Sequence, residues 1–181
     1  MSKNINFLLG DIEKTGLKDE SFDIVVFSAV LHHFPDFSKA IREGYRVLKP
    51  GGRIFAYDPN RLNPIMWLYR DKKSPLCSTK GRTENERLLT KGELESALIT
   101  NKFSNVKIVS ISGMTFKYVE SSLGMKVLLI YNKFESLLDK IFLGRKIGSF
   151  LVSYGEKGKV LHCDSAAGIQ KRRSLNLRCS I

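Results

Sequence analysis

Short apolar runs and longer amphipathic repeats follow one another along the chain, and this pattern predicts alternating strands and helices. Nearly continuous apolar runs occur at residues 5–9 (INFLL), 22–28 (FDIVVFS) and 53–58 (RIFAYD), which is typical of buried strands. We expect the strand at 22–28 to be covered on both faces. Residues 105–112 alternate between apolar and polar side chains and residues 147–154 form a last apolar run, so both ranges are also predicted as strands.

Apolar residues recur at helical spacing in three further segments. The first predicted helix lies just before Lys49-Pro50-Gly51-Gly52, a sequence that stops a helix and turns the chain. A second is predicted at about 91–101, because Thr90 and Glu93 fit the capping-box pattern at a helix start. A third, at 123–143, has one apolar stripe. We expect this stripe to pack in the core rather than to shape a pocket or rest on a membrane surface.

Strands that alternate with helices predict an α/β fold with a doubly wound sheet. In such sheets ligands bind beside the carboxyl ends of the strands. Three segments follow predicted strands at this edge: Gly10-Asp11-Ile12, Ser28–His33 and Asp58-Pro59-Asn60. We therefore expect these segments to share one rim, where a ligand would bind.

Composition places the chain among soluble proteins of one domain, with 181 residues, 43% hydrophobic and 27% charged. No apolar run reaches the roughly 18–20 residues of a membrane helix, and the N-terminus lacks the features of a signal peptide. A cytoplasmic location is therefore expected. Cys77, Cys163 and Cys179 are far apart in the sequence, so we expect free thiols.

The net charge of +12 raises the question of a nucleic-acid partner. The lysines are scattered and no basic run is interleaved with aromatic residues, so such a partner is not expected. The basic cluster Lys171-Arg172-Arg173 lies near the end of the chain, where no period is sustained. We divide the chain into a folded part, 1–154, and a basic tail, 155–181, that is predicted to be disordered.

Three stretches resemble the class I S-adenosylmethionine-dependent methyltransferases, specifically the small-molecule group called type 11. They are LLGDIEKTGLKDESFDIVVFSAVLHHFPD, AIREGYRVLKPGGRIFAYDPN and LLTKGELESALITNKFSNVKIV, and the resemblance covers about residues 5–112. The middle stretch is the most specific, because RVLKPGG is followed directly by a strand. The resemblance implies a Rossmann-like sheet, S-adenosylmethionine as cofactor, and methyl transfer to a small-molecule acceptor.

The resemblance also implies which residues bind the cofactor. In that family, the loop that matches Gly10-Asp11-Ile12 receives the adenine: the acidic side chain accepts a hydrogen bond from the exocyclic amine, and the next residue offers its backbone N–H. The loop that matches Ser28-Ala29-Val30-Leu31 lies along the methionine part. Small residues there leave room for the sulfonium and its methyl group.

The chain departs from the family at its N-terminal side. The family's first half contains a strand, a glycine-rich turn of the E/D-x-G-x-G type, a helix and a second strand ending in an acidic residue. In the family's sheet order, 3-2-1-4-5-7-6, these first two strands separate the third from the fourth. Here no G-x-G occurs, and the run at 5–9 resembles the third strand. We therefore expect a truncated chain with a partial sheet of about five strands.

This departure leaves two functions open. In a partial sheet the strand at 5–9 must pair directly with 22–28, stay frayed, or find a partner chain, and an unpaired apolar strand favours association. The chain is then either a methyltransferase or a non-catalytic remnant, which would act as an interaction module or as half of a split enzyme.

Two adjacent histidines follow the second predicted strand. A metal site is not expected there, because adjacent side chains on a loop diverge and no third ligand is placed by spacing. His32 and His33 are candidates for a general base, since a near-neutral pKa suits removal of a proton from an acceptor. In the structural alternative, one histidine packs under the following helix and the other lines the pocket. Asp58, Asn60 and Trp67 are the candidate acceptor contacts.

Overall fold

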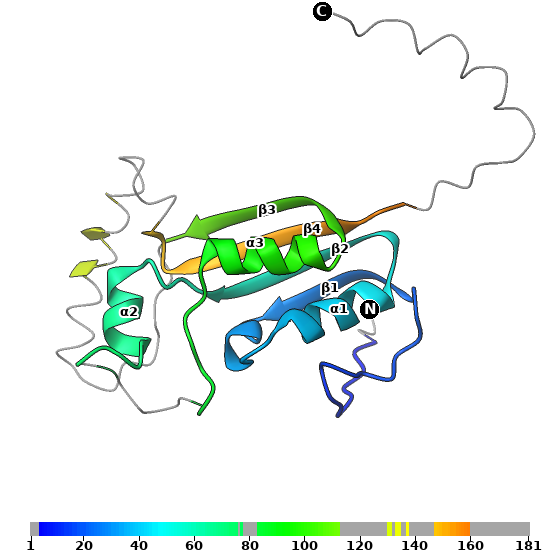
Figure 1. Ribbon diagram of the computed structural model, residues 1–181, viewed down its shortest axis with the longest axis horizontal. Coiled ribbons are helices and arrows are strands. Elements are labelled where there is room, and N and C mark those ends of the chain that lie inside the picture. Colours follow the sequence, from blue (N-terminus) through cyan, green and yellow to red (C-terminus); the bar gives the residue numbers. More distant parts are fainter. Residues whose placement is uncertain are drawn as a thin grey trace, which may run out of the picture.

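One sheet determines where the candidate rim lies. The computed structural model describes residues 4–75, 77, 83–112, 130–131, 133–134, 137 and 147–159. Within them, four strands form a sheet in the order β1-β2-β4-β3 (Figure 1). The strands are β1 (Phe22–Ser28), β2 (Leu48–Pro59), β3 (Phe103–Ile111) and β4 (Phe150–Lys157).

The strand directions confirm the predicted class of fold. β1 runs parallel to β2, whereas β4 runs antiparallel to both of its neighbours, β2 and β3. This is the arrangement expected for the fourth to seventh strands of the family that the sequence resembles, in the order 4-5-7-6. The α/β class and the partial Rossmann-like sheet are thus confirmed, with four strands in the described residues instead of about five.

Two helices, α1 (Ser38–Val47) and α3 (Lys91–Thr100), cover one face of this sheet (Figure 1). A short 3-10 turn, η1 (Leu31–His33), joins β1 to α1, and a third helix, α2 (Pro64–Arg70), follows β2. Alternate strand residues point toward α1 and α3 and bury their side chains there. The shared core consists of Phe27, Leu31, Phe37, Ala40, Ile41, Leu48, Ile54, Ala56, Leu89, Leu94, Leu98, Phe103, Ile108 and Leu151.

Local capping explains where two of the helices begin. The predicted capping box of α3 is present: Thr90 Oγ1 accepts a hydrogen bond from the Glu93 N–H at 3.3 Å, and Glu93 Oε2 accepts one from the Thr90 N–H at 2.8 Å. The apolar pattern did not predict α2. Its cap is Asn63, whose Oδ1 accepts from the Met66 N–H at 2.8 Å, and Pro64 is its first residue.

The predicted strand at residues 5–9 is wrong. The structure gives these residues no strand, and Phe7 and Leu9 are 91% and 106% exposed. An apolar run becomes a strand only where a neighbour can take its backbone hydrogen bonds. β1 does not act as this neighbour. Residues 5–9 therefore stay unpaired in the structure and do not pair with 22–28.

The prediction that residues 22–28 are covered on both faces is also wrong. Phe27 faces the core and is 5% exposed, whereas Ile24 and Val26 on the other face are 54% and 62% exposed. β1 is an edge strand, with β2 as its only neighbour in the described sheet. Its apolar outer face is therefore available for packing against a further segment.

β4 continues past the predicted domain boundary at residue 154. Residues 155–157 belong to the strand and pair with β2 and β3, so the predicted tail begins too early. The reason is Lys157, whose buried ammonium donates to Glu20 Oε1 at 3.2 Å, to the Tyr45 carbonyl at 3.1 Å and to the Leu48 carbonyl at 2.8 Å. The remainder of the predicted tail, 160–181, lies outside the described residues.

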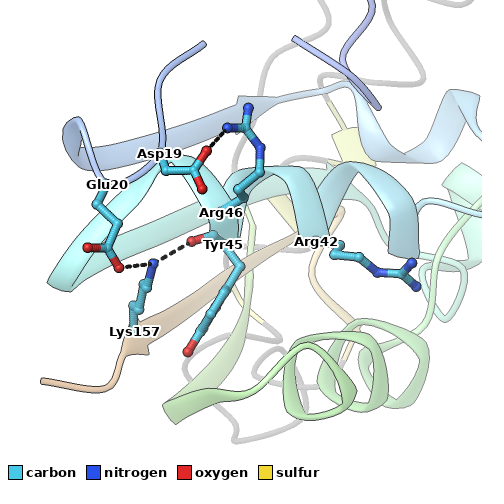
Figure 2. A pocket seen from close by; sticks show the side chains of 6 residues that line it. All are labelled: Asp19, Glu20, Arg42, Tyr45, Arg46 and Lys157. Atoms are coloured by element: carbon cyan, nitrogen blue, oxygen red, sulfur yellow. Dashed lines mark hydrogen bonds and ion pairs between the residues drawn. The ribbon is translucent and has the colours of Figure 1, made fainter. Parts of the chain in front are cut away.

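Figure 2 shows the pocket around this lysine. It lies near the start of β2, because Glu156 pairs with Arg53, and so it is at the opposite end of the strand from the candidate rim. Four of its five charged side chains pair with one another: Lys157 with Glu20, and Arg46 with Asp19. The pocket is best explained as a structural ion-pair cluster.

The helix predicted at 123–143 lies mostly outside the described residues. Residues 130–131, 133–134 and 137 are helical. Ile130, Phe134 and Leu137 belong to the apolar stripe that was expected in the core, yet they are 70%, 54% and 55% exposed. For these three residues that expectation is wrong. Among the residues that the structure describes, no helix is long and apolar enough to cross a membrane.

Glu43 on α1 binds both Arg46 of the same helix and Thr15 of the N-terminal segment, and so it holds that segment against α1. Glu43 Oε1 accepts from the Thr15 N–H at 2.9 Å and from the Thr15 hydroxyl at 2.6 Å. Arg46 donates to the two carboxylate oxygens of Glu43 at 2.6 and 2.9 Å. Hydrogen bonds from Arg46 and Thr15 stabilise the charged carboxylate and lower the pKa of Glu43 from 4.5 to about 2.

We expect Glu43→Gln to destabilise the protein more at pH 7 than in acid. A carboxylate with a lowered pKa adds stability above the unfolded-state pKa of 4.5, and this stability is lost as the pH falls through about 2. Because Arg46 is partly exposed, the loss at pH 7 should be about 1–2 kcal/mol. Urea unfolding at pH 7 and pH 3 measures it, and the loss should be smaller at pH 3. Glu95→Gln, on an exposed part of α3, is the control and should change little; equal losses at both pH values for Glu43→Gln would contradict the prediction.

Candidate functional site

The carboxyl ends of β1 and β2 form the candidate rim. The two strands are paired in parallel register up to Ser28 and Tyr57, and the Ala29 N–H donates to the Tyr57 carbonyl at 2.8 Å. Ala29 then has a φ of 54°, which turns the chain sharply into η1. Left-handed backbone is uncommon for a residue other than glycine, and alanine is among the smallest that can occupy it. The turn holds η1 directly over the end of β2.

A buried histidine–aspartate pair lies at this edge. Asp58 Oδ1 accepts from His32 Nδ1 at 2.8 Å and from the His32 backbone N–H at 3.1 Å. His32 is 7% exposed and Asp58 is fully buried. Burial raises the pKa of the Asp58 carboxyl, while the two hydrogen bonds from His32 act in the opposite direction. Asp58 was predicted to face the acceptor; it faces His32 instead, so any part it takes in chemistry passes through that ring.

His33 occupies the outer side of the same turn. It is half-exposed, its ring lies 4.1 Å from that of His32 between centroids, and its Nδ1 is hydrogen-bonded to Thr83 Oγ1 at 2.7 Å. Burial, together with the neighbouring His32, lowers the pKa of His33. The division into one packed and one outward histidine agrees with the structural alternative drawn from the sequence.

The loop before α3 adds residues that the sequence did not indicate. The Arg87 N–H donates to the His32 carbonyl at 2.9 Å, which holds this loop against η1. Thr83 and Glu86 are thereby brought to the two histidines, and Glu86 is 5% exposed. Neither belongs to a periodic element, so the sequence carried no signal for them; the burial of Glu86 is known only from the structure.

The turn predicted to receive adenine lies beside α1. Gly10 and Asp11 are exposed and Ile12 is half-buried against the core. Asp11 Oδ1 accepts from the Glu13 N–H at 2.8 Å, so in the described part of the chain its side-chain hydrogen bonding stays within its own turn. Glu13 lies 3.7 Å from Lys39 in the first turn of α1, which places the turn toward the end of α1 that follows η1.

The loop predicted to lie along the methionine part is only partly open. Ser28 and Ala29 are exposed and Val30 is half-buried, whereas Leu31 is fully buried in the core. Only the backbone of Leu31 can therefore contact a cofactor, and its side chain is a packing residue.

The remaining acceptor candidates differ in exposure. Asn60 is fully buried, with its Nδ2 donating to the Gly148 carbonyl at 2.7 Å and its Oδ1 accepting from the Leu62 N–H at 3.0 Å. Its amide holds two backbone segments together, and its contact with an acceptor stays a prediction. Trp67 on α2 is 38% exposed and could still contact a ligand.

Known proteins match this chain in sequence. The sequence model of the family described as "Methyltransferase domain" matches residues 1–56. Human arsenite methyltransferase is 29% identical over 156 residues, which cover 72% of this chain and 40% of that protein. The ubiquinone/menaquinone biosynthesis C-methyltransferase UbiE of Haemophilus ducreyi is 40% identical over 68 residues, which cover 36% of this chain and 26% of that protein. The chain thus spans less than half the length of either relative.

A solved structure matches the fold. The crystal structure of a SAM-dependent methyltransferase from Thermotoga maritima superposes with a TM-score of 0.57 and 23% identity, covering 83% of this chain and 62% of that chain. This likeness supports the fold, and the sequence matches support the family. Together they support the resemblance of this chain to the class I S-adenosylmethionine-dependent methyltransferases, whose methyl donor is S-adenosylmethionine.

Proposed function

We propose that the chain is part of an enzyme that transfers the methyl group of S-adenosylmethionine to a small-molecule acceptor. The observation that carries this proposal is the buried His32–Asp58 pair, which lies at the strand edge where sheets of this class bind their ligands. The names of the relatives, an arsenite methyltransferase and a C-methyltransferase of ubiquinone and menaquinone biosynthesis, favour a small acceptor over a macromolecule.

The residues at the rim fit a cofactor of this kind. Gly10 has no heavy atom within 4 Å of the position that a Cβ would take, so its backbone is open to a ligand. The exposed carboxylate of Asp11 suits the exocyclic amine of adenine, which has only donors to offer. Ser28 and Ala29 are small and exposed, and they would lie along the methionine part.

His32 is the better candidate for proton transfer. Methyl transfer is an in-line displacement in which the protein mainly orients the reactants and excludes water. An acceptor that reacts through an O–H or N–H group must also lose a proton. Because Asp58 engages Nδ1 of His32 at 2.8 Å, the ring is held in one orientation and its Nε2 is left to accept that proton.

Calorimetric titration with S-adenosylhomocysteine, the product form of the cofactor, tests the proposal. We expect binding to the chain, and we expect Asp11→Ala to weaken it at least about tenfold, the effect of losing a hydrogen bond to a charged group. Asp36→Ala is the matched control: Asp36 is also exposed and accepts from the N–H two residues on, that of Ser38, at 3.0 Å. It should bind like the unaltered chain.

Two results would count against the proposal. The absence of heat at millimolar ligand would contradict cofactor binding by this chain. Equal affinity of Asp11→Ala and Asp36→Ala would remove Asp11 from the site and make it an ordinary turn residue. Transfer of a labelled methyl group to small acceptors containing oxygen, nitrogen or activated carbon then extends the test from binding to reaction.

A second candidate function is favoured by the exposed outer face of β1. Ile24 and Val26 present apolar side chains beside an unpaired strand edge, and residues 4–10 leave that edge uncovered. This arrangement suits an interaction module or one half of a split enzyme, which binds a complementing chain at the edge. No heat with S-adenosylhomocysteine from the chain alone, followed by binding once such a chain is added, would favour this function over the first.

A further inference from the structure

Two histidines and a glutamate converge at one side of η1. A ring nitrogen of His32, a ring nitrogen of His33 and a carboxylate oxygen of Glu86 all lie within 4.8 Å of one another. They come from two segments that are far apart in the sequence and are held together by the Arg87–His32 backbone hydrogen bond of 2.9 Å. This juxtaposition removes the reason for not expecting a metal site, since the adjacent rings stay close and the fold supplies a third ligand.

Both imidazoles are already oriented through hydrogen bonds at their Nδ1 atoms. Nδ1 of His32 is bonded to Asp58 Oδ1 at 2.8 Å, and Nδ1 of His33 to Thr83 Oγ1 at 2.7 Å. Metal-binding histidines usually have one ring nitrogen hydrogen-bonded to a carboxylate or another oxygen, which leaves the second nitrogen for the ion. The other oxygen of Asp58, Oδ2, is buried and has no hydrogen-bond partner in the described structure.

Arg70 is the group that opposes a cation here. Its Nη1 lies 3.3 Å from Glu86 Oε1, so without an ion the buried carboxylate is neutralised by the guanidinium. The side chain of Arg70 is 32% exposed and that of Glu86 only 6%. The arginine can therefore turn toward solvent when an ion arrives, while the glutamate stays in place.

We propose that His32, His33 and Glu86 form a binding site for a divalent transition-metal ion of the zinc type. Two imidazoles and one carboxylate are a donor set that zinc accepts, and three protein ligands leave a fourth position for water or another small ligand. This inference is independent of the proposed methyl transfer. The metal-bound form would, however, use the His32 nitrogen that is assigned to proton transfer, so zinc should inhibit any reaction that depends on that base.

Titration of the metal-free chain with Zn²⁺ alone tests the site, without cofactor or acceptor. The three cysteines should first be replaced by serine, so that thiolates do not bind the ion. We expect one Zn²⁺ per chain by calorimetry, and a visible spectrum of a four-coordinate ion when Co²⁺ is used instead. His33→Gln and Glu86→Gln should each weaken binding at least about tenfold.

Two further variants separate a built site from incidental binding. Arg70→Gln should tighten Zn²⁺ binding several-fold, because it removes the cation that competes for Glu86. His162→Gln is the control, since His162 is the third histidine of the sequence, and it should bind like the parent chain. His33→Gln is the decisive variant because this half-exposed ring can be changed with little risk to folding, which far-UV circular dichroism checks.

The proposal is overturned if no Zn²⁺ binds, or if affinity is lost in His162→Gln and kept in His33→Gln. Failure would leave the proposed methyl transfer untouched, because the calorimetry with S-adenosylhomocysteine reports on a different ligand and on Asp11.

Discussion

Replacement of Gly148 by alanine is expected to destabilise the fold by about 2–4 kcal/mol. A Cβ at this position would lie 2.6 Å from the carbonyl oxygen, 2.7 Å from the carbonyl carbon and 2.9 Å from the nitrogen of Ile111. All three are backbone atoms at the end of β3, so no side chain can move aside. The glycine must therefore allow β3 and the start of β4 to approach each other closely.

The same substitution would disturb a second contact. The Gly148 carbonyl accepts from Asn60 Nδ2 at 2.7 Å, and this hydrogen bond joins the end of β2 to the start of β4. Because Asn60 is fully buried, its amide has no water to replace a lost partner. Moving Gly148 would thus also loosen the chain that follows Asp58 at the rim.

Urea unfolding of Gly148→Ala and Gly92→Ala measures this effect against a matched control. Gly92 lies in the first turn of α3 with nothing within 4 Å of its added Cβ, so alanine there should be neutral or stabilise by up to about 1 kcal/mol. A Gly148→Ala protein as stable as the parent would mean that the close approach to Ile111 is not required.

The elements that the sequence predicted are those fixed by local chemistry. The Thr90–Glu93 capping box gave the start of α3, and the turn at Lys49–Gly52 gave the end of α1. The helix α2 was missed, although Asn63 followed by Pro64 is a helix-start signal in itself.

The wrong predictions concern which strands pair with one another, and a single apolar run gives no information on its neighbours. Phe7 and Leu9 have the composition of a buried strand, but a strand also needs a neighbour for its backbone. β1 has such a neighbour on one edge only. Its outer face stays exposed for a different reason: α1 and α3 both cover the other face of the sheet, so Ile24 and Val26 lie on an uncovered side (Figure 1).

Most residues of the candidate rim could be named from the sequence, but the contacts between them could not. His32, His33 and Asp58 were all named as candidates, yet the bond between His32 and Asp58 depends on the parallel register that sets Ser28 beside Tyr57. That register is a property of the sheet and not of either segment. Glu86 was not named at all, because an irregular loop carries it to the histidines.

Asp58 is the residue on which the geometry of the rim depends most. Its Oδ1 is the acceptor for two buried donors of His32, the backbone N–H at 3.1 Å and the ring Nδ1 at 2.8 Å. Asp58→Ala leaves both donors without a partner and also leaves a small cavity. We expect a loss of about 3–5 kcal/mol from these costs together.

Asp58→Asn removes the negative charge of the side chain but keeps an oxygen that can accept hydrogen bonds. Its amide oxygen can accept the same two hydrogen bonds, and because burial raises the pKa of Asp58, the charged form contributes less than it would at the surface. The loss should therefore be smaller, about 1–2 kcal/mol, mainly from an amide N–H that takes the place of the unpartnered Oδ2. Urea unfolding measures both variants, with Asp23→Ala as the control. The side chain of Asp23 is 78% exposed and, among the described residues, bonds only to Lys49, so this variant should change stability by no more than about 0.5 kcal/mol. If Asp58→Ala costs no more than Asp58→Asn, then Asp58 does not hold His32 through its oxygen. In that case the backbone of η1 alone would hold the rim in its conformation.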